Sequence, residues 1–326
     1  MSDGARPEFF LAMPDELEAK IAEWRDAAGE RLRVDHVTSY SGHKVYALTL
    51  TGPTGDASAR RRCYFSQPHA HEPGATAGMI DVIEQLVTGR DMLGEATRLD
   101  PDEVLARTVV TFNAIGNADG RSRAPVKFWD GSEYTNDEFW CWMRGEDPAE
   151  PGKMWGRYDL WDDREMAAPA PVGIVYERID EHRWVEPNRS QLSSFFKLFH
   201  MMDAQFGYER WLDLHQTEFV GSEHNCMVLL PLEGLASGAV AAENVAWGRE
   251  IVCAWREAGY AAMPEPRALS YTGLQAEYFR ENWGPIHARM SALATEVKNN
   301  AADAPPRFQM KAQAAAVEVS IGRMLG

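Results

Sequence analysis

The sequence predicts an α/β protein in which helices cover both faces of a central mixed, largely parallel sheet. Short apolar segments rich in β-branched residues alternate along the chain with longer segments whose apolar residues recur at helical spacing. The chain has 326 residues, of which 45% are hydrophobic and 25% charged, and this is enough for one large soluble domain. No internal repeat or low-complexity linker divides it, so we expect a single domain over residues 1–326.

The first half of the chain begins with a predicted helix. Leu17, Ile21 and Trp24 share one face of this helix, and Asp15 stands near its start. Alternating apolar residues bounded by Gly or Pro indicate the strands, and Gly89 ends the second helix. In chain order we predict a helix at 14–32, strands at 44–52 and 60–67, a helix at 74–89 and a buried strand at 108–116.

An aromatic-rich segment follows at 128–165, and its apolar residues show poor periodicity. We interpret it as an ordered loop insertion, because disordered linkers are poor in aromatic residues. Its aromatic side chains could line a substrate pocket or form a small core of their own. They are Trp129, Tyr134, Trp140, Trp142, Trp155, Tyr158 and Trp161.

The second half returns to alternating strands and helices. The segment 239–259 strongly indicates a helix, which ends at Gly259. In chain order we predict a helix at 190–206, strands at 210–219 and 225–234, a helix at 239–259, a strand at 291–299 and a helix at 308–325.

Charge and composition exclude several classes of partner. The formal net charge of −16 disfavours nucleic acids and anionic membranes, since both are bound through basic surfaces. A small anionic substrate held by a local arginine remains compatible with this charge. The four cysteines are far apart, so no disulfide framework is expected. Because the first residues lack a signal-peptide pattern and no apolar run could span a bilayer, we expect a cytoplasmic protein.

Candidate metal ligands occur in the stretch "YFSQPHAHEPGATAG". His69, His71 and Glu72 lie between a predicted strand and a predicted helix, at the carboxyl end of a sheet strand where α/β proteins build sites. Histidine and carboxylate are zinc ligands. The spacing His-x-x-Glu is weak evidence by itself, because it recurs at His215 and Glu218.

Two further segments carry polar residues in apolar strands. In "WLDLHQTE", His215 lies near the end of a strand, and Asp213 on the same face could orient its ring. In "ALATEVKNN", Glu296 lies inside a β-type run. It could face solvent, or it could be a general base with a pKa set by burial and a nearby cation.

Five of these segments, in this order, resemble the zinc carboxypeptidase family, which comprises the carboxypeptidase A-like metallopeptidases and their amidohydrolase relatives. The resemblance covers about residues 38–310 and so implies one zinc carboxypeptidase-like catalytic domain with the insertion at 128–165. The motifs are "YSGHKVYALTL", "HAHEPGATAGMIDVIEQL", "FNAIGNADG", "LDLH" and "LATEV". The family motif is Asn-Pro-Asp-Gly, and in "NADG" Ala118 stands in place of the proline.

The resemblance implies a zinc site with one Zn²⁺ per chain. His69, Glu72 and His215 would hold the metal, and Glu296 would be the general base. His71 would not be a ligand and would either contact the site from outside or face solvent. Glu218 and Glu277 are rival candidates for the base.

The sequence departs from the family in its basic residues. Family peptidases carry an Asn-Arg pair after Asn-Pro-Asp-Gly that binds the terminal carboxylate, and no clean pair follows "NADG" in that interval. Arg144, preceded by Met143, is our candidate for this catalytic and substrate-binding arginine, and Arg123 is the alternative partner of the oxyanion. The other nearby arginines are Arg121 and Arg157, and the candidate lid tyrosines are Tyr271, our choice for substrate binding, and Tyr278.

Three functions follow, in decreasing order of support. The first is a zinc hydrolase that cleaves an amide bond of a small peptide, as a carboxypeptidase does. The second is an amidohydrolase of N-acyl amino acids, similar to aspartoacylases or desuccinylases, which the missing Asn-Arg pair favours. The third is a binding protein that keeps the fold without catalysis.

Overall fold

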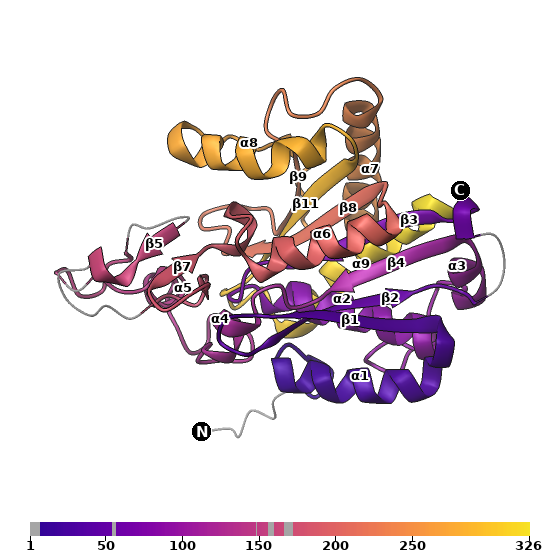
Figure 1. Cartoon of the computed structure of the whole chain (residues 1–326), viewed down its shortest axis with the longest axis horizontal. Coiled ribbons are helices and arrows are strands. Elements are labelled where there is room, and N and C mark those ends of the chain that lie inside the picture. The colour runs from indigo at the N-terminus through magenta and orange to yellow at the C-terminus, as the bar shows by residue number, and fades with distance from the viewer. Residues whose placement is uncertain (1–6, 54–56, 148, 156–159, 166–171) are drawn as a thin grey trace.

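The computed structural model describes residues 7–53, 57–147, 149–155, 160–165 and 172–326. An eight-stranded mixed sheet forms its centre, in the order β1-β2-β4-β3-β8-β11-β9-β10 (Figure 1). The strands are β1 Leu32–Thr38, β2 Lys44–Leu50, β3 Arg61–Ser66, β4 Thr108–Asn113, β8 Arg210–Thr217, β9 Cys226–Leu230, β10 Arg267–Ala268 and β11 Ser291–Lys298.

The middle strands β4, β3, β8 and β11 run parallel, whereas β2 and β9 flank them in antiparallel orientation. All six residues of β4 are buried, and so are the first seven residues of β8. Parallel strands covered on both faces need such continuous burial. The predicted α/β class with a mixed, largely parallel sheet is therefore confirmed.

Helices cover both faces of the sheet (Figure 1). α9 packs on α2, on α7 and on the central strands, and Gly78 of α2 allows this approach because a Cβ there would lie 2.5 Å from Gln313 Cβ. On the other face, Phe199 of α6 stacks on Trp211 of β8, and Trp283 of α8 packs against the same ring at a tilt. These helices are α2 Pro73–Thr88, α7 Gly238–Glu257, α9 Pro306–Leu325, α6 Ser194–Phe206 and α8 Gly273–His287.

Each helix and strand predicted from the sequence is present within a few residues of its expected bounds. β1, α3, α8 and the short elements α4, β6, β7 and β10 were not predicted. The segment 128–165 is also not a pure loop, because it contains a helix and contributes β5 to a small second sheet of order β5-β7-β6. The remaining elements are α1 Pro14–Ala28, α3 Pro101–Arg107, α4 Ala118–Ser122, α5 Asn136–Arg144, β5 Leu160–Asp162, β6 Glu177–Arg178 and β7 Arg183–Val185.

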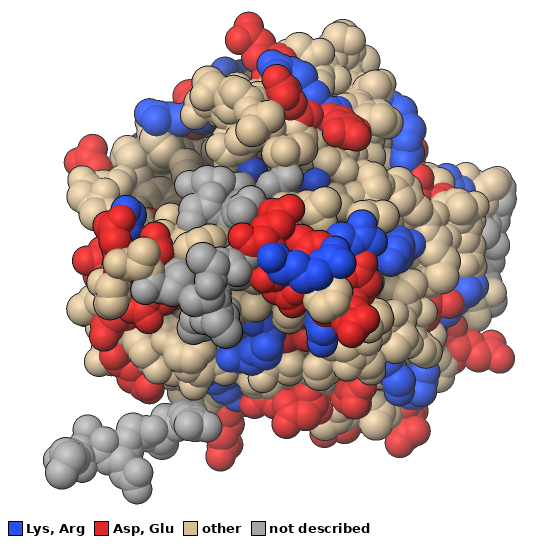
Figure 2. All heavy atoms as spheres, turned by 60° about the vertical axis from the view of Figure 1, so that its left-hand side comes forward, with Lys and Arg blue, Asp and Glu red and all other residues tan. Residues whose placement is uncertain are grey.

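Acidic and basic side chains intermingle on the face shown in Figure 2, and neither sign forms a continuous field there. None of the helices that the structure describes combines the length and apolarity needed to cross a bilayer.

Candidate active site

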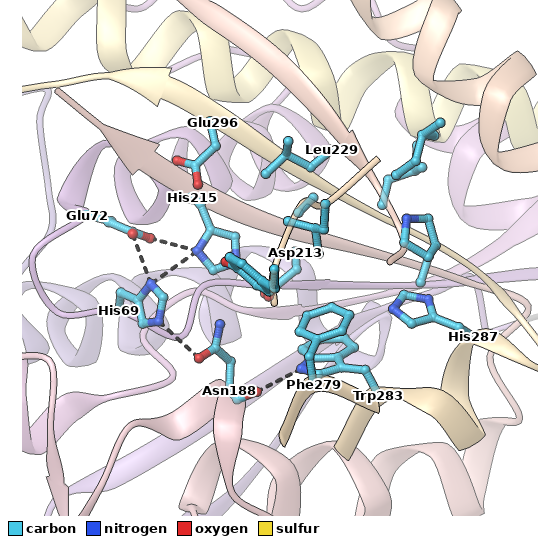
Figure 3. Close-up of a pocket in the computed structure, with 17 residues that line it drawn as sticks. His69, Glu72, Asn188, Asp213, His215, Leu229, Phe279, Trp283, His287 and Glu296 are labelled. Atoms are coloured by element: carbon cyan, nitrogen blue, oxygen red, sulfur yellow. Dashed lines mark hydrogen bonds and ion pairs between the residues drawn. The ribbon is translucent and has the colours of Figure 1, made fainter. Parts of the chain in front are cut away.

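Three side chains from different parts of the chain converge at the carboxyl end of the central strands (Figure 3). His69 lies in the turn between β3 and α2, Glu72 precedes the first residue of α2, and His215 lies near the end of β8. His69 Nδ1 is 2.9 Å from Glu72 Oε1 and 3.1 Å from His215 Nδ1. His215 Nδ1 is 3.1 Å from Glu72 Oε2. All three residues are buried.

The outer nitrogen of each histidine faces an acceptor. His215 Nε2 lies 2.8 Å from Asp213 Oδ2, and His69 Nε2 lies 3.1 Å from Asn188 Oδ1 and 3.3 Å from Glu186 Oε1. If each Nε2 carries the proton and donates it to these acceptors, both Nδ1 atoms present a lone pair to the shared point. Asp213 is itself held by Ser66 Oγ, which donates to Oδ1 at 2.5 Å.

This group of donors fits a divalent transition metal. Two imidazole nitrogens and a carboxylate are ligands that zinc prefers, at about 2.0 to 2.1 Å. Donors on a tetrahedron of that size stand about 3.3 Å apart, close to the observed 2.9 to 3.1 Å. The predicted residues His69, Glu72 and His215 are therefore together, in an arrangement that can hold a metal.

The histidines and the carboxylates of the group stabilise each other's charged forms. Burial alone would lower the pKa of His69, but the Glu72 and Glu186 carboxylates raise this pKa to about 9. Burial alone would raise the pKa of Glu72, but His69 and His215 outweigh it and hold this pKa well below its ordinary value. Metal binding would therefore displace protons from the histidines.

Glu296 lies directly beside His215, because β11 and β8 pair in parallel with these two residues in register. Its side chain lines the same pocket, and its buried Oε2 has no hydrogen-bond partner among the described residues. Burial raises the pKa of Glu296 to about 8, and the charge of Glu72 adds to this rise while the two histidines oppose it. The rival Glu277 is exposed on α8, and Glu218 accepts a hydrogen bond from Thr217 Oγ1 at 3.1 Å. Neither rival lines the pocket.

The pocket extends from this group to a far end built by α8, β9 and β11, and its volume is about 80 Å³ (Figure 3). Tyr271 lines it and is half-buried, and the Arg189 guanidinium lies 5.4 Å from the centre of the Tyr271 ring. Tyr278 does not line it. The lining residues are His69, Glu72, Asn188, Asp213, His215, Leu229, Leu230, Pro231, Leu269, Tyr271, Phe279, Trp283, His287, Ala292, Leu293, Ala294 and Glu296.

The structure reveals an Asn-Arg pair that the sequence prediction missed. Asn188 and Arg189, in "VEPNRS", lie beyond the aromatic segment and so outside the interval after "NADG" in which the prediction found no clean pair. Asn188 lines the pocket and its amide nitrogen points into it (Figure 3). Trp283 Nε1 donates to the Asn188 carbonyl at 2.7 Å, and Asn282 Nδ2 donates to the Arg189 carbonyl at 2.8 Å. α8 therefore fixes the backbone of the pair.

Glu186 was also missed, and it joins the arginines to the metal group. Its carboxylate lies 2.6 Å from Arg144 Nη1, 3.0 Å from Arg189 Nε and 3.3 Å from His69 Nε2. The two arginines and His69 keep the pKa of Glu186 well below its ordinary value although burial opposes this. Arg144 thus lies near the site, as predicted, but behind Glu186 and outside the pocket lining.

Arg123 does not lie at the site, contrary to the prediction. Its guanidinium donates to the carbonyl oxygens of Val172, Gly173 and Tyr176 at 2.7 to 3.3 Å, and it stacks over Trp184 at 5.4 Å. These bonds fasten 172–176 to α4 and leave its NH groups directed at the protein. Arg121 likewise donates to backbone carbonyls, and Arg157 lies outside the described residues.

His71 is buried beside the group rather than exposed, with Nε2 3.3 Å from Glu72 Oε1. None of the predicted tryptophans lines the pocket, which supports the small-core alternative. Trp129 packs on Phe139, and Trp161 packs on Tyr176 and Trp184. Tyr158 lies outside the described residues.

No family model matches the chain, and a search of curated protein sequences finds no match. Solved structures do match. A metallo-carboxypeptidase from Burkholderia cenocepacia is 12% identical, with a TM-score of 0.57 over 94% of this chain and 68% of that chain. Carboxypeptidase A from Helicoverpa armigera is 12% identical, with a TM-score of 0.58 over 98% and 75%. Bovine thrombin-activatable fibrinolysis inhibitor, solved with a tick carboxypeptidase inhibitor, is 12% identical, with a TM-score of 0.57 over 98% and 99%. The chain therefore has a zinc carboxypeptidase-like fold, as its five motifs predicted.

Proposed function

We propose that this protein is a zinc-dependent hydrolase that removes the C-terminal residue of a small peptide. One observation carries the proposal: the Nδ1 atoms of His69 and His215 and the Glu72 carboxylate converge beside Glu296 at the end of a pocket. A zinc ion held by these three side chains would polarise the scissile carbonyl and increase the acidity of a water molecule.

Glu296 is the general base in this proposal. It takes a proton from the attacking water and passes it to the nitrogen of the leaving amine as the carbon–nitrogen bond breaks. Its position in register with His215 brings its carboxylate to the metal group, and its unpartnered Oε2 is free to accept that proton. The bound cation would oppose the pKa rise that burial causes, so that Glu296 is ionised at neutral pH.

Asn188 and Arg189 would bind the terminal carboxylate of the substrate. The Asn188 amide nitrogen points into the pocket, and a guanidinium offers paired donors to a carboxylate. Arg144, which shares Glu186 with Arg189, supports the positive potential on this side and is the candidate for stabilising the oxyanion. Tyr271, whose ring lies next to the Arg189 guanidinium, would also contact the substrate.

The Asn-Arg pair weakens the case for the N-acyl amino acid alternative, because its apparent absence was the reason to favour that branch. Both substrate classes end in a free carboxylate, so they differ only on the acyl side of the amide bond. The four cysteines are free thiols, which agrees with the reducing cytoplasm as the site of action. A small peptide is thus the proposed partner, and the net charge of −16 gives no basis for nucleic acid binding.

Hydrolysis of dipeptides and of N-acyl amino acids by zinc-loaded protein tests the proposal, with zinc content measured in parallel. We expect one zinc per chain and faster release of amino acids from dipeptides. Faster hydrolysis of N-acyl amino acids would establish the alternative. Protein that retains no stoichiometric metal without chelators would support the binding-protein hypothesis and overturn the proposal.

A further inference from the structure

The far end of the pocket contains a histidine that has no partner. His287 is the last residue of α8, is 4% exposed and lines the pocket. Its ring lies beside Phe279 and Trp283, at 5.8 and 5.7 Å between ring centres. Neither of its ring nitrogens has a hydrogen-bond partner among the described residues. His287 therefore lines the cavity and carries two buried ring nitrogens that no described group bonds.

Unpaired polar groups are rare in protein interiors, because the lost hydration is not replaced. A substrate group that reaches the far end of the pocket could form the hydrogen bonds that His287 lost with water. Burial lowers the pKa of His287 to about 4, so its ring is neutral near pH 7. A neutral imidazole offers one N–H donor and one nitrogen acceptor, which match a hydroxyl or a carboxamide.

The other polar groups near this end already have partners. Both Asp213 oxygens are engaged, by Ser66 and His215, and the Trp283 indole N–H donates to the Asn188 carbonyl. The described lining contains no lysine or arginine, and the surrounding walls are mostly leucine, proline and aromatic side chains. A substrate carboxylate would lose its hydration here without a counter-charge, and a substrate cation would meet near this end the Asp213 carboxylate, whose two oxygens already have partners. This disfavours both acidic and basic side chains.

The size of the pocket limits the side chain as well. The whole pocket has a volume of about 80 Å³. An apolar cavity of about 150 Å³ accommodates a benzene ring, so an aromatic side chain would not fit here without rearrangement. A side chain of a few heavy atoms would fit.

We propose that this pocket selects substrates whose C-terminal residue has a short uncharged side chain ending in a hydroxyl or a carboxamide, with His287 as its hydrogen-bond partner. The inference rests on the proposed hydrolase function. It assigns catalysis to the metal end of the pocket and side-chain selection to the α8 end. Threonine and asparagine represent the two preferred side chains.

Dipeptides with matched C-terminal residues test this selection. Threonine and valine have nearly the same shape, as do asparagine and aspartate, while leucine is the apolar analogue of asparagine. We expect kcat/KM at least about 10-fold higher for threonine than valine, and for asparagine than leucine or aspartate, which is about 1.4 kcal/mol. Equal rates, or faster hydrolysis of the valine, leucine or aspartate dipeptide, would overturn the inference.

Variants then assign the preference to His287. His287→Leu should bring the threonine-to-valine ratio close to one, whereas His287→Gln, which keeps a donor and an acceptor, should retain part of it. His36→Leu, at an exposed histidine of the edge strand β1, should leave the ratio unchanged. If His287→Leu does not fold, the threonine-to-valine ratios of His287→Gln and of the wild type still test the role of His287. An unchanged ratio in a folded His287→Leu protein would contradict the role of His287.

Calorimetric binding of free threonine, valine and asparagine to zinc-loaded protein separates this inference from the proposed function. Tighter binding of threonine than valine supports the pocket chemistry even if no dipeptide is hydrolysed, in which case the proposed function alone fails. Binding of valine as tight as threonine, or no binding of any of the three, overturns the inference.

Discussion

At one end of the pocket the outer nitrogens of His69 and His215 face acceptors, while at the other end neither ring nitrogen of His287 has a partner. His69 comes from the turn between β3 and α2, His215 from near the end of β8, and His287 from the end of a helix. Partnered rings are held in one orientation and, once neutral, in one tautomer, which directs the inner nitrogen at a metal. An unpartnered ring can accept whatever ligand satisfies it. The comparison thus separates a fixed end from a selective end.

The strongest test of the fixed end removes a metal ligand. His69→Ala or His215→Ala should abolish stoichiometric zinc binding and lower kcat/KM by at least about 10⁴-fold, since the metal contributes several kcal/mol to the transition state. Zinc content and dipeptide hydrolysis would be measured together. His71→Ala is the matched control, because His71 is buried next to Glu72 but is not one of the three proposed ligands. Loss of zinc in His71→Ala with retention in His69→Ala would reverse the assignment.

Removing the base should have the next largest effect. Glu296→Gln should lower kcat by about 10² to 10⁴-fold while zinc remains bound, as expected for loss of general-base catalysis. The exposed Glu277 provides the control, and Glu277→Gln should be fully active. If Glu296→Gln stays active and Glu218→Gln or Glu277→Gln is inactive, a different glutamate is the base.

In the proposed function, Arg189 binds the terminal carboxylate of the substrate. Arg189→Gln should lower kcat/KM by about 10 to 10²-fold, because hydrogen bonds to charged groups contribute about 1.5 to 3 kcal/mol. Arg249→Gln, at an exposed arginine of α7, is the control. A C-terminally amidated dipeptide should be a poor substrate for the wild type and lose little further in Arg189→Gln. Equal losses for free and amidated substrates would exclude a carboxylate contact.

The residues of the fixed end were predicted from the resemblance of their motifs to the zinc carboxypeptidase family, and the fold explains why these residues come together. His69 and Glu72 adjoin in the chain, and strand residues such as His215 and Glu296 end up side by side because parallel strands align their carboxyl ends. Asn188 and Arg189 can be read from the sequence as an Asn-Arg pair. They follow an aromatic segment whose apolar residues have no helical or strand periodicity, so the sequence does not indicate where in the fold the pair lies.

The selective end was not predictable. His287 belongs to α8, whose sequence contains Pro285 and lacks a clear apolar stripe, so neither the helix nor its position could be inferred. Glu186 gave no local signal either. Its role comes from Arg144, Arg189 and His69, which only tertiary packing brings around it. Arg123 is the opposite case. It lies close to the "NADG" motif in sequence, but in the fold its guanidinium donates to backbone carbonyls away from the site.

The partners of the outer nitrogens should matter less than the ligands themselves. Glu186→Gln and Asp213→Asn should each weaken zinc binding by about 10 to 100-fold, as is typical when the acceptor behind a ligating histidine is altered. Competition with a chromophoric chelator would measure the affinity. Glu177→Gln is a useful control, because Glu177 is also buried but accepts from the backbone N–H of Ser194 at the start of α6. Unchanged affinity in both variants would show that these acceptors do not tune the metal site.

The selective end should reveal itself in the pH dependence of stability. The folded-state pKa of His287 is about 4, below the ordinary 6.5, so between these values the unfolded chain takes up a proton that the folded protein does not. The stabilisation is complete above pH 6.5 and is lost as the pH falls toward 4. From pH 7 to pH 5 this amounts to about 2 kcal/mol of the free energy of unfolding. Urea denaturation at both pH values would measure the decrease in the free energy of unfolding from pH 7 to pH 5. This decrease should be smaller by about 2 kcal/mol in His287→Leu than in wild type, and His36→Leu should behave like wild type. Equal acid loss in wild type and His287→Leu would mean that the ring is protonated in the folded protein, and the far end would then favour an anionic side chain.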